Sequence, residues 1–479
     1  MMTSDVAVIG SGMGSLSAAA LLAKENLKVL IIEQNWQPGG CTSSYWRKGF
    51  IFEAGATTLV GLDDHMPLKY LLDQTGIQIS PRKLSLPMQV HLSNGLVLNR
   101  FQNLNEWIEE VEGKFGGQQR AFWLKCLEIS QFVWNSSTKY LHFPPSRFND
   151  FLQLAKKAAL KDVFFAKYAL VSTEKMLSKY GLDDPEFRKF IDEQLLITAQ
   201  NPAKEVNFLF GAAALCYTNY GNYYMDGGLL NLVNPFIDYV KSKNGAIVFR
   251  EKVENIKKEN DIFQINTSKN QYSAKKIVSG IPFNQTNELI ESNQQSKILH
   301  SGQLYSAFQM GIGFKSDKHF DTIHFQIHTK KPLPGCGAKS FFVSLNHPED
   351  TTRSDIEGAR VASVSTHISD PEKNIFDGEI VEQAILEILV EKGFFKLEDI
   401  IYKHSSTQKS WNKWTNRVYG SVGGYPQFMK TKPWQMIESR VQEGVYQCGD
   451  TSYPGQGIPG ATLSGIIAAE KLKSDLNLG

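Results

Sequence analysis

Three glycines near the start of the chain have the spacing of a phosphate-binding turn. Gly10, Gly12 and Gly14 follow a short apolar run, and a stretch rich in small residues continues to Lys24. Such glycines let the backbone approach a pyrophosphate, whose negative charge is favoured at a helix N-terminus. Glu33 lies near the spacing at which a carboxylate accepts ribose hydroxyls, and it would repel a 2′-phosphate. The pattern therefore predicts a dinucleotide site.

The elements expected around these residues are those of a nucleotide-binding unit. Residues 6–9 predict a buried parallel strand, 15–24 a helix, and 28–32 a second strand that ends at Glu33. Ser15 replaces the last glycine of the usual pattern, but serine is small enough to keep helix and strand close. An ordinary glycine-rich turn is the alternative, and the order of strand, helix and acid argues against it.

A second segment near the C-terminus suits the same kind of site. Residues 445–448 predict a strand that ends at Gly449 and Asp450, and the turn 454–461 leads into a helix over about 462–473. The alternative is a Gly/Pro loop that joins a strand to a terminal helix. Because both ends of the chain carry such a segment, we expect them to close a single site.

The motifs that follow Glu33 identify a family. Residues 38–43, 49–57 and the C-terminal segment 444–472 resemble the phytoene desaturase, carotenoid isomerase and retinol saturase family, part of the amine-oxidase-like flavoproteins. The resemblance implies FAD, bound non-covalently, with the Gly-Gly loop around its pyrophosphate and the segment 55–57 near the isoalloxazine. It also implies that the C-terminal helix points its N–H groups at the O2 and N1 edge of the flavin. Many relatives have Arg where this chain has Cys41, whereas carotenoid isomerases have a small residue there.

The motifs and the resemblance together give the expected FAD-binding residues. Asp450 is expected near the pyrophosphate and ribityl chain, and the backbone of Val253 near the adenine. The full set comes from the first turn, the acid, the Gly-Gly loop, the segment after it, one central strand and the C-terminal turn: Gly10, Ser11, Gly12, Met13, Gly14, Ser15, Glu33, Gln34, Gly39, Gly40, Cys41, Thr42, Ser43, Ala56, Thr57, Val253, Gly449, Asp450, Gly457, Ile458, Pro459 and Ala461.

The expected fold class is α/β, with a Rossmann-type, GR2-like FAD-binding domain and a discontinuous α+β substrate domain. A chain of 479 residues is too long for one core. We expect the FAD-binding domain to use residues 1–65, 220–285 and 425–479. The substrate domain, 66–219 and 286–424, should combine a helical subdomain with a sheet over the flavin, whose strand-like runs are 306–314, 324–328, 340–345 and 361–366.

Two segments of the substrate domain indicate an apolar ligand or a membrane. Residues 151–171 read as one basic amphipathic helix with Lys156, Lys157 and Lys161 on one side. Such a helix either lies on a membrane surface or packs its apolar face into the core. Residues 206–217 are apolar and small, which suits core or the wall of a tunnel.

Composition excludes several classes of protein. A net charge of +2 argues against a broad nucleic-acid surface, and no apolar run reaches the ~18 residues of a membrane span. Five cysteines without a CxxC pattern suit reduced thiols in the cytoplasm. No basic segment of a signal peptide precedes the first strand. We therefore expect a cytoplasmic protein; if the helix at 151–171 lies on a membrane rather than in the core, the protein would associate peripherally with the inner membrane face.

No acid–base pair or nucleophile stands out, which suits a flavin enzyme because the cofactor carries the reaction. His319, His324 and His328 lie close in sequence, yet without Cys or carboxylate partners they suit polar strand residues better than a metal site. We expect no bound metal. Tyr419 and Tyr425 either line the flavin site or pack against it.

The expected substrate is an apolar, carotenoid-like polyene, which the enzyme would desaturate, saturate or isomerise between cis and trans forms. The Pro-Gly-Gln-Gly element at 454–457 favours the isomerase and saturase side of the family. A flavin-containing amine oxidase is the alternative with the same fold. A non-enzymatic lipid- or prenyl-binding protein of this fold is the third reading, and the motifs around Gly10, Glu33 and Asp450 argue against it.

Overall fold

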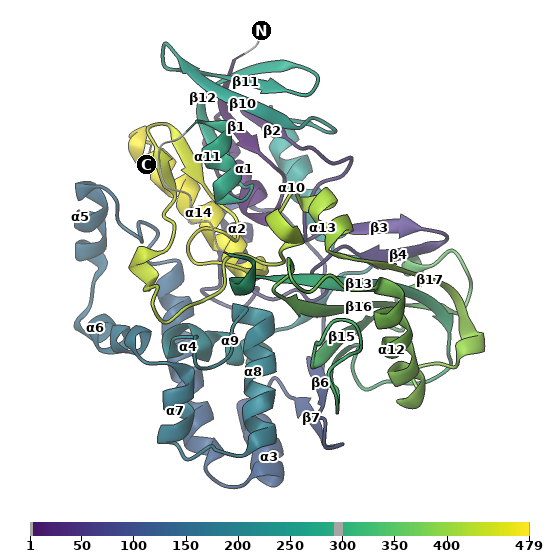
Figure 1. Cartoon of the computed structure of the whole chain (residues 1–479). Coiled ribbons are helices and arrows are strands. Elements are labelled where there is room, and N and C mark those ends of the chain that lie inside the picture. The colour runs from purple at the N-terminus through teal and green to yellow at the C-terminus, as the bar shows by residue number, and fades with distance from the viewer. Residues whose placement is uncertain (1–2, 292–299, 479) are drawn as a thin grey trace.

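The computed structural model describes residues 3–291 and 300–478, and it contains two large sheets (Figure 1). The first sheet has eight strands, most of them parallel. Two of its parallel segments, residues 6–9 and 29–32, are largely buried apolar runs, as expected for strands covered on both faces. The parallel strands are β1 (Ser4–Ile9), β2 (Val29–Ile32), β9 (Ala246–Val248), β12 (Gln271–Ser279) and β19 (Val445–Gln447); β10 (Val253–Glu259), β11 (Ile262–Thr267) and β18 (Arg440–Gln442) pair antiparallel.

The two ends of the chain pack against each other on this sheet. Helix α1 (Met13–Lys24) is buried along almost its whole length and packs against α14 (Gly457–Asp475). A Cβ on Gly465 would lie 2.1 Å from the carbonyl oxygen of Gly14, and a Cβ on Gly14 would lie 2.7 Å from the backbone nitrogen of Gly449. Only glycine therefore allows this separation. Further helices cover the sheet: α2 (Pro67–Thr75), α10 (Leu230–Ser242) and α11 (Phe283–Leu289).

The second sheet has seven strands and a mixed order. Its outer face is apolar and packs against α12 (Gly378–Glu391), with Phe308, Val343 and Ile385 in the shared core. The strand runs expected from the sequence are confirmed. In order across the sheet the strands are β17 (Ile400–Ser406), β13 (Tyr305–Lys315), β16 (Ala359–Ser369), β15 (Ser340–Leu345), β14 (His324–His328), β6 (Met88–His91) and β7 (Val97–Arg100).

A layer of helices lies below this sheet in the view of Figure 1. Its core joins aromatic side chains such as Trp107, Trp123 and Phe190. The segment 66–219 was expected to be helical in pattern, and most of it is; residues 88–91 and 97–100 depart from this as β6 and β7, because β6 pairs parallel with β14 and extends the sheet. The helices are α3 (Leu104–Phe115), α4 (Gln119–Ser137), α7 (Thr173–Lys179), α8 (Pro185–Ala199) and α9 (Phe208–Leu215).

Short elements connect the two sheets. The hairpin of β3 (Ser44–Arg47) and β4 (Phe50–Glu53) is held by a buried ion pair in which Arg353 Nη1 lies 2.7 Å from Glu53 Oε1. The remaining connections are β5 (Arg82–Lys83) with β8 (Tyr223–Tyr224), and α13 (Gln408–Thr415). The expected start of the last helix at 462 is wrong, since α14 begins at Gly457 within the glycine-rich turn itself.

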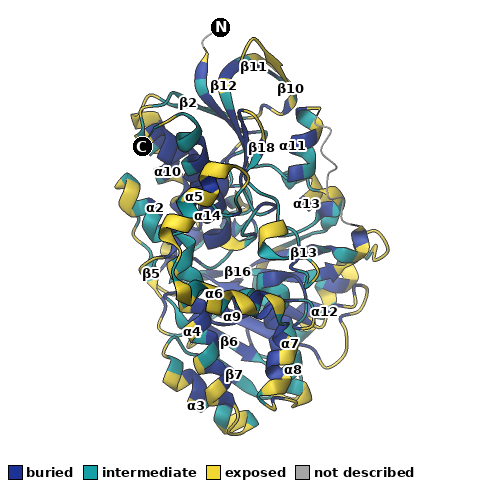
Figure 2. Ribbon diagram, turned by 90° about the vertical axis from the view of Figure 1, so that its left-hand side faces the viewer, coloured by how far each residue is buried: buried dark blue, intermediate teal, exposed yellow. Residues whose placement is uncertain are grey.

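Residues 148–170 form an arm at the edge of the molecule, and we call them the helical arm (Figure 1). The expectation of one helix over 151–171 is wrong. Helix α5 (Phe148–Lys157) ends at Ala158, whose backbone is extended, and α6 (Leu160–Ala166) and the 3-10 turn η1 (Lys167–Leu170) follow. Figure 2 shows α5 and α6 largely exposed. Within residues 3–291 and 300–478, none of the helices is long and apolar enough to cross a membrane.

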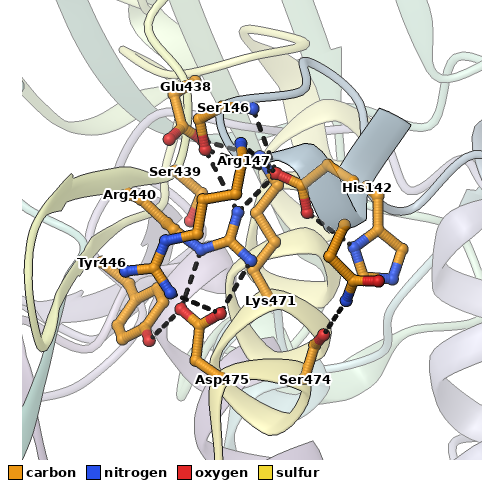
Figure 3. Close-up of polar contacts among 12 residues, drawn as sticks. His142, Ser146, Arg147, Glu438, Ser439, Arg440, Tyr446, Lys471, Ser474 and Asp475 are labelled. Carbon is orange, nitrogen blue, oxygen red and sulfur yellow. Dashed lines mark hydrogen bonds and ion pairs between the residues drawn. The ribbon is translucent and has the colours of Figure 1, made fainter. Parts of the chain in front are cut away.

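A buried network of charges fastens the base of the arm to the C-terminal part of the chain (Figure 3). Asp150 of α5 accepts hydrogen bonds from Arg440 Nη1 at 2.6 Å and from His142 Nδ1 at 3.0 Å. Arg440 also binds Asp475 of α14 at 2.8 Å, and Asp475 accepts from the hydroxyl of Tyr446 at 2.7 Å. Burial alone would raise the pKa of Asp150, but these hydrogen bonds hold it well below its usual range. The arm is therefore anchored at its root.

The close contact of α1 and α14 predicts an effect on stability. Replacing Gly465 by Ala would force a Cβ against the Gly14 carbonyl, and overpacking of this kind costs about 1–3 kcal/mol. We expect a lower midpoint in thermal unfolding for Gly465→Ala. Gly113→Ala in the exposed face of α3 is the matched control, since nothing lies within 4 Å of its Cβ position. Equal unfolding midpoints for the two variants would contradict the tight packing.

Candidate functional site

A cavity of about 870 Å³ is lined by residues from both sheets, from α4, α8 and α9, and from both termini of the chain. This volume falls within the range of small-molecule and cofactor sites. All but two of the residues expected to bind FAD line this cavity. The two exceptions lie just behind it: the Ser15 hydroxyl donates to the carbonyl of Ile9, and the Ser43 hydroxyl accepts from Gln37. The sequence motifs therefore converge in space.

The turn between β1 and α1 has the features of a phosphate site. Gly12 is the N-cap of α1, no side chain caps this helix end, and no acidic residue lies in its first turn. Nothing lies within 4 Å of a Cβ built on Gly12, so the turn is open toward the cavity. Gly39 and Gly40 follow with positive φ, and Gly12 pairs with Gly39. Free N–H groups at a helix N-terminus bind anions, so the residues present fit a pyrophosphate.

Glu33 lies at the end of β2 and is held in a fixed orientation. Its Oε2 accepts the backbone N–H of Ser11 at 2.9 Å and the Ser11 hydroxyl at 2.5 Å, and its Oε1 accepts the N–H of Asn35 at 2.8 Å. A carboxylate has about four acceptor positions, so one remains for a further donor. Glu33 lines the cavity, where a ribose hydroxyl would meet that position.

Asp450 is paired with an arginine that the sequence analysis missed. The Nη2 atom of Arg417 lies 2.8 Å from both carboxylate oxygens of Asp450, and both residues line the cavity and are largely buried. Burial would lower the pKa of Arg417, but the Asp450 carboxylate keeps it raised. Because Arg417 neutralises Asp450, this carboxylate would not bring a net negative charge to a pyrophosphate bound beside it. In the sequence, the only indication that Arg417 could belong to the site was its position six residues before Gly423, which also lines the cavity.

Two tryptophans of α13 also line the cavity and were not predicted. The Nε1 group of Trp414 donates to the carbonyl of Gly40 at 3.4 Å, and its own carbonyl accepts from Asn35 Nδ2 at 3.0 Å. Trp411 lies against Gly55, where a Cβ would come within 3.0 Å of the indole ring. Helix α13 therefore forms the wall of the cavity beside the Gly-Gly loop. The sequence suggested Tyr419 and Tyr425 as candidates to face this site, but neither lines the cavity. Val422 and Gly423, which lie between them in the sequence, line it instead.

The N-terminus of α14 opens into the same cavity. Its N-cap, Gln456, makes no side-chain capping bond and is held by Gln200 at 2.7 Å and by the carbonyl of Ile197 at 2.9 Å. Gly457 and Ile458 line the cavity beside it. A helix N-terminus stabilises negative charge, so this end suits the electron-rich edge of a reduced flavin.

Cys41 and His324 line the cavity, but neither has the features of a reactive centre. Burial raises the pKa of the Cys41 thiol to about 11, so it is protonated at neutral pH. His324 binds the hydroxyl of Ser344 at 2.9 Å, and His319 is exposed before β14. In the described ranges, no three His, Cys, Asp or Glu side chains gather in a way that would hold a metal ion.

Known proteins resemble this chain along its whole length. A family model described as flavin containing amine oxidoreductase matches residues 16–473. Chloroplastic prolycopene isomerase of Daucus carota is 26% identical over 505 residues, covering 99% of this chain and 80% of the relative. All-trans-retinol 13,14-reductase of Danio rerio is 26% identical over 260 residues, covering 53% and 42%. The structure of cyclohexylamine oxidase from Brevibacterium oxydans has a TM-score of 0.63 at 14% identity, covering 99% and 100%. The predicted fold class is confirmed.

The Arg417–Asp450 pair predicts non-additive effects on FAD binding. Arg417→Ala should weaken binding, because an uncompensated buried carboxylate would then face the pyrophosphate. In the double variant Arg417→Ala/Asp450→Asn the charge is gone, so we expect FAD affinity to recover in part. Titration of the apoproteins with FAD measures both constants. Asp450→Asn alone completes the cycle, and a loss of affinity in the double variant equal to the product of the losses in the two single variants would contradict the pairing.

Proposed function

The chain belongs to the family of flavin-containing amine oxidoreductases, and from this premise we propose that it is an enzyme that acts on an apolar polyene. The predictions of FAD as cofactor and of an FAD-dependent oxidoreductase are confirmed by the family match. Prolycopene isomerase, matched over 99% of this chain, supports the polyene, as does the retinol reductase over part of it. The reaction is a desaturation, a saturation or a cis–trans isomerisation of that polyene.

One observation carries this proposal: part of the cavity is lined without charge. Helices α4, α8 and α9 contribute apolar side chains such as Val133, Trp134 and Phe210. Neither these helices nor the seven-stranded sheet adds an Asp, Glu, Lys or Arg to the described lining. An ammonium group there would have no carboxylate to pair with, and burying an unpaired charge is costly. The lining therefore supports a long apolar chain over an amine.

The residues of this chain hold and shield the reactants. FAD, when bound, supplies hydride transfer to or from the substrate. The open N-terminus of α1 holds the pyrophosphate, Glu33 the ribose, and the N-terminus of α14 the electron-rich edge of the ring. Trp411 and Trp414 line the cavity beside the Gly-Gly loop, where they would shield a bound cofactor from solvent. We assign FAD binding to residues 1–65, 220–285 and 425–479, and substrate binding to 66–219 and 286–424.

We also propose that the helical arm binds the surface of a membrane that contains anionic lipids. Its apolar side chains are exposed rather than packed in a core: Leu160 is 93% exposed, Phe148 77% and Val163 73%. Exposed lysines, Lys156 and Lys161 among them, lie beside these groups. Apolar side chains with neighbouring lysines are the combination that binds anionic bilayers.

The arm lies next to the apolar part of the cavity lining. Phe165 of α6 stacks on Phe132 of α4, with 4.5 Å between ring centroids, and Asp162 lies 3.2 Å from Lys139 Nζ. The next residues of α4, Val133 and Trp134, line the cavity. A polyene dissolved in a bilayer would therefore reach the cavity close to the point where the arm binds.

The proposed polyene function predicts a change in pigments. Expressed in a host that makes phytoene and lycopene isomers, the protein should change the pigment profile seen by chromatography. More double bonds mean desaturation, fewer mean saturation, and the same number with altered geometry means isomerisation. Unchanged pigments, together with anaerobic bleaching of the flavin by an amine, would replace the polyene with an amine substrate.

The proposed membrane contact predicts an effect of mutations in the helical arm. The double variant Leu160→Glu/Val163→Glu should lose most of its co-sedimentation with vesicles of mixed neutral and anionic lipid, because carboxylates are repelled by anionic lipid and do not enter the acyl region as Leu and Val do. Binding by the unaltered protein should weaken at high salt. Ile375→Glu is the matched control, because Ile375 is 76% exposed but lies far along the chain from the arm. If the double variant sediments as well as the control, the arm is not the membrane contact.

A further inference from the structure

The seven-stranded sheet turns a polar face toward the cavity. Across this face, His324 of β14 lies opposite Ser344 of β15, and Ser365 of β16 lies opposite Gln309 of β13. Residues opposite each other in neighbouring strands share one face of a sheet. We call five cavity-lining residues on this face the polar strip: Gln309, His324, Ser344, Ser365 and His367.

The polar strip is not an ordinary solvent-facing side of a sheet. The opposite face is apolar and packs on α12, so alternation along the strands is regular. The strip faces a cavity that is also lined by apolar side chains of α4, α8 and α9. His324 is only 2% exposed. In an enclosed, largely apolar space, hydrogen-bonding groups have few partners besides one another and whatever the cavity holds.

Several groups of the strip lack partners. The Nδ1 atom of His324 binds the Ser344 hydroxyl at 2.9 Å, but its Nε2 is buried without a hydrogen bond. Gln309, Ser365 and His367 are half-buried beside the cavity, and within residues 3–291 and 300–478 their side chains make no hydrogen bond to the protein. Buried polar groups are usually paired, and those that are not mark places where a ligand or water completes the pairing.

The strip is also uncharged. Burial lowers the pKa of His324 to about 4 and that of His367 to about 4, so both imidazoles are neutral near pH 7. Neutral histidine, serine and glutamine side chains both donate and accept hydrogen bonds, but they do not neutralise a carboxylate or an ammonium group. Their partner should be a neutral oxygen.

We infer that the substrate of this site is an apolar chain that carries a hydroxyl or carbonyl oxygen, and that this oxygen hydrogen-bonds to the polar strip. The inference rests on the proposed polyene function and narrows it, because a pure hydrocarbon would leave the strip unpaired. The Nε2 atom of His324 and the amide of Gln309 supply the recognition. The apolar rest of the substrate lies along Val133, Trp134 and Phe210.

A matched pair of ligands tests this assignment. The FAD-bound protein is titrated with all-trans-retinol and with its deoxy hydrocarbon, and binding is followed by the flavin absorption and by tryptophan fluorescence. We expect the alcohol to bind about tenfold more tightly or better. Gln309→Leu should reduce this preference about five- to tenfold, the range expected for one lost hydrogen bond. Ser344→Ala should reduce it by a similar factor, because it removes the bond that orients His324.

Ser340→Ala is the control, since Ser340 lies on the same face of β15 but donates to Glu193 at 2.6 Å and does not line the cavity. FAD content and unfolding midpoints verify that each variant is folded. Equal binding of both ligands by the unaltered protein would overturn the inference and leave the polyene function standing. If neither ligand binds, the polyene function fails and the inference falls with it. A changed flavin absorption in Ser344→Ala without ligand, and an unchanged preference, would assign the strip to the cofactor instead.

Discussion

The contact between the first and last helices determines the rest of this structure. Gly14 and Gly465 bring the backbones of α1 and α14 closer than any side chain would allow. This contact places the turn after β1 beside the turn after β19, so that both helix N-termini open into one cavity. A cofactor with two phosphates and an electron-rich ring needs positive potential at two separated points, and the paired helices provide it. Segments more than 400 residues apart in the sequence therefore act as one binding surface.

The cavity combines two different environments. Around the nucleotide-binding turns, charges are present and paired: Glu33 is held by Ser11 and Asn35, and Asp450 by Arg417. On the side of α4, α8 and α9 the lining carries no charge, and an apolar ligand costs little to bury there. The polar face of the second sheet lies between these environments. Under the proposed function, this division would let one fold hold a charged cofactor and an uncharged substrate in contact.

Much of the site could be predicted from the sequence, because its motifs are local. The glycine spacing and the acid at 33 depend on a few neighbouring residues, and strands such as those at 6–9, 306–314 and 340–345 show clear apolar patterns. Arg417 and Trp414 could not be found this way, since their partners, Asp450 and Gly40, lie far away in the sequence.

The break in the helical arm at Ala158 also depends on contacts that are distant in the sequence. Alanine favours helix, but Asp162 caps a new helix at Ala159 and pairs with Lys139, so tertiary contacts override local preference.

The central claim is that the two ends of the chain together hold one FAD, and flavin stoichiometry tests it most directly. The purified protein is denatured, and the released flavin is quantified and identified by chromatography. The account predicts one free FAD per chain, released without a covalent bond to the protein. A folded but colourless protein that FAD does not reconstitute would contradict it.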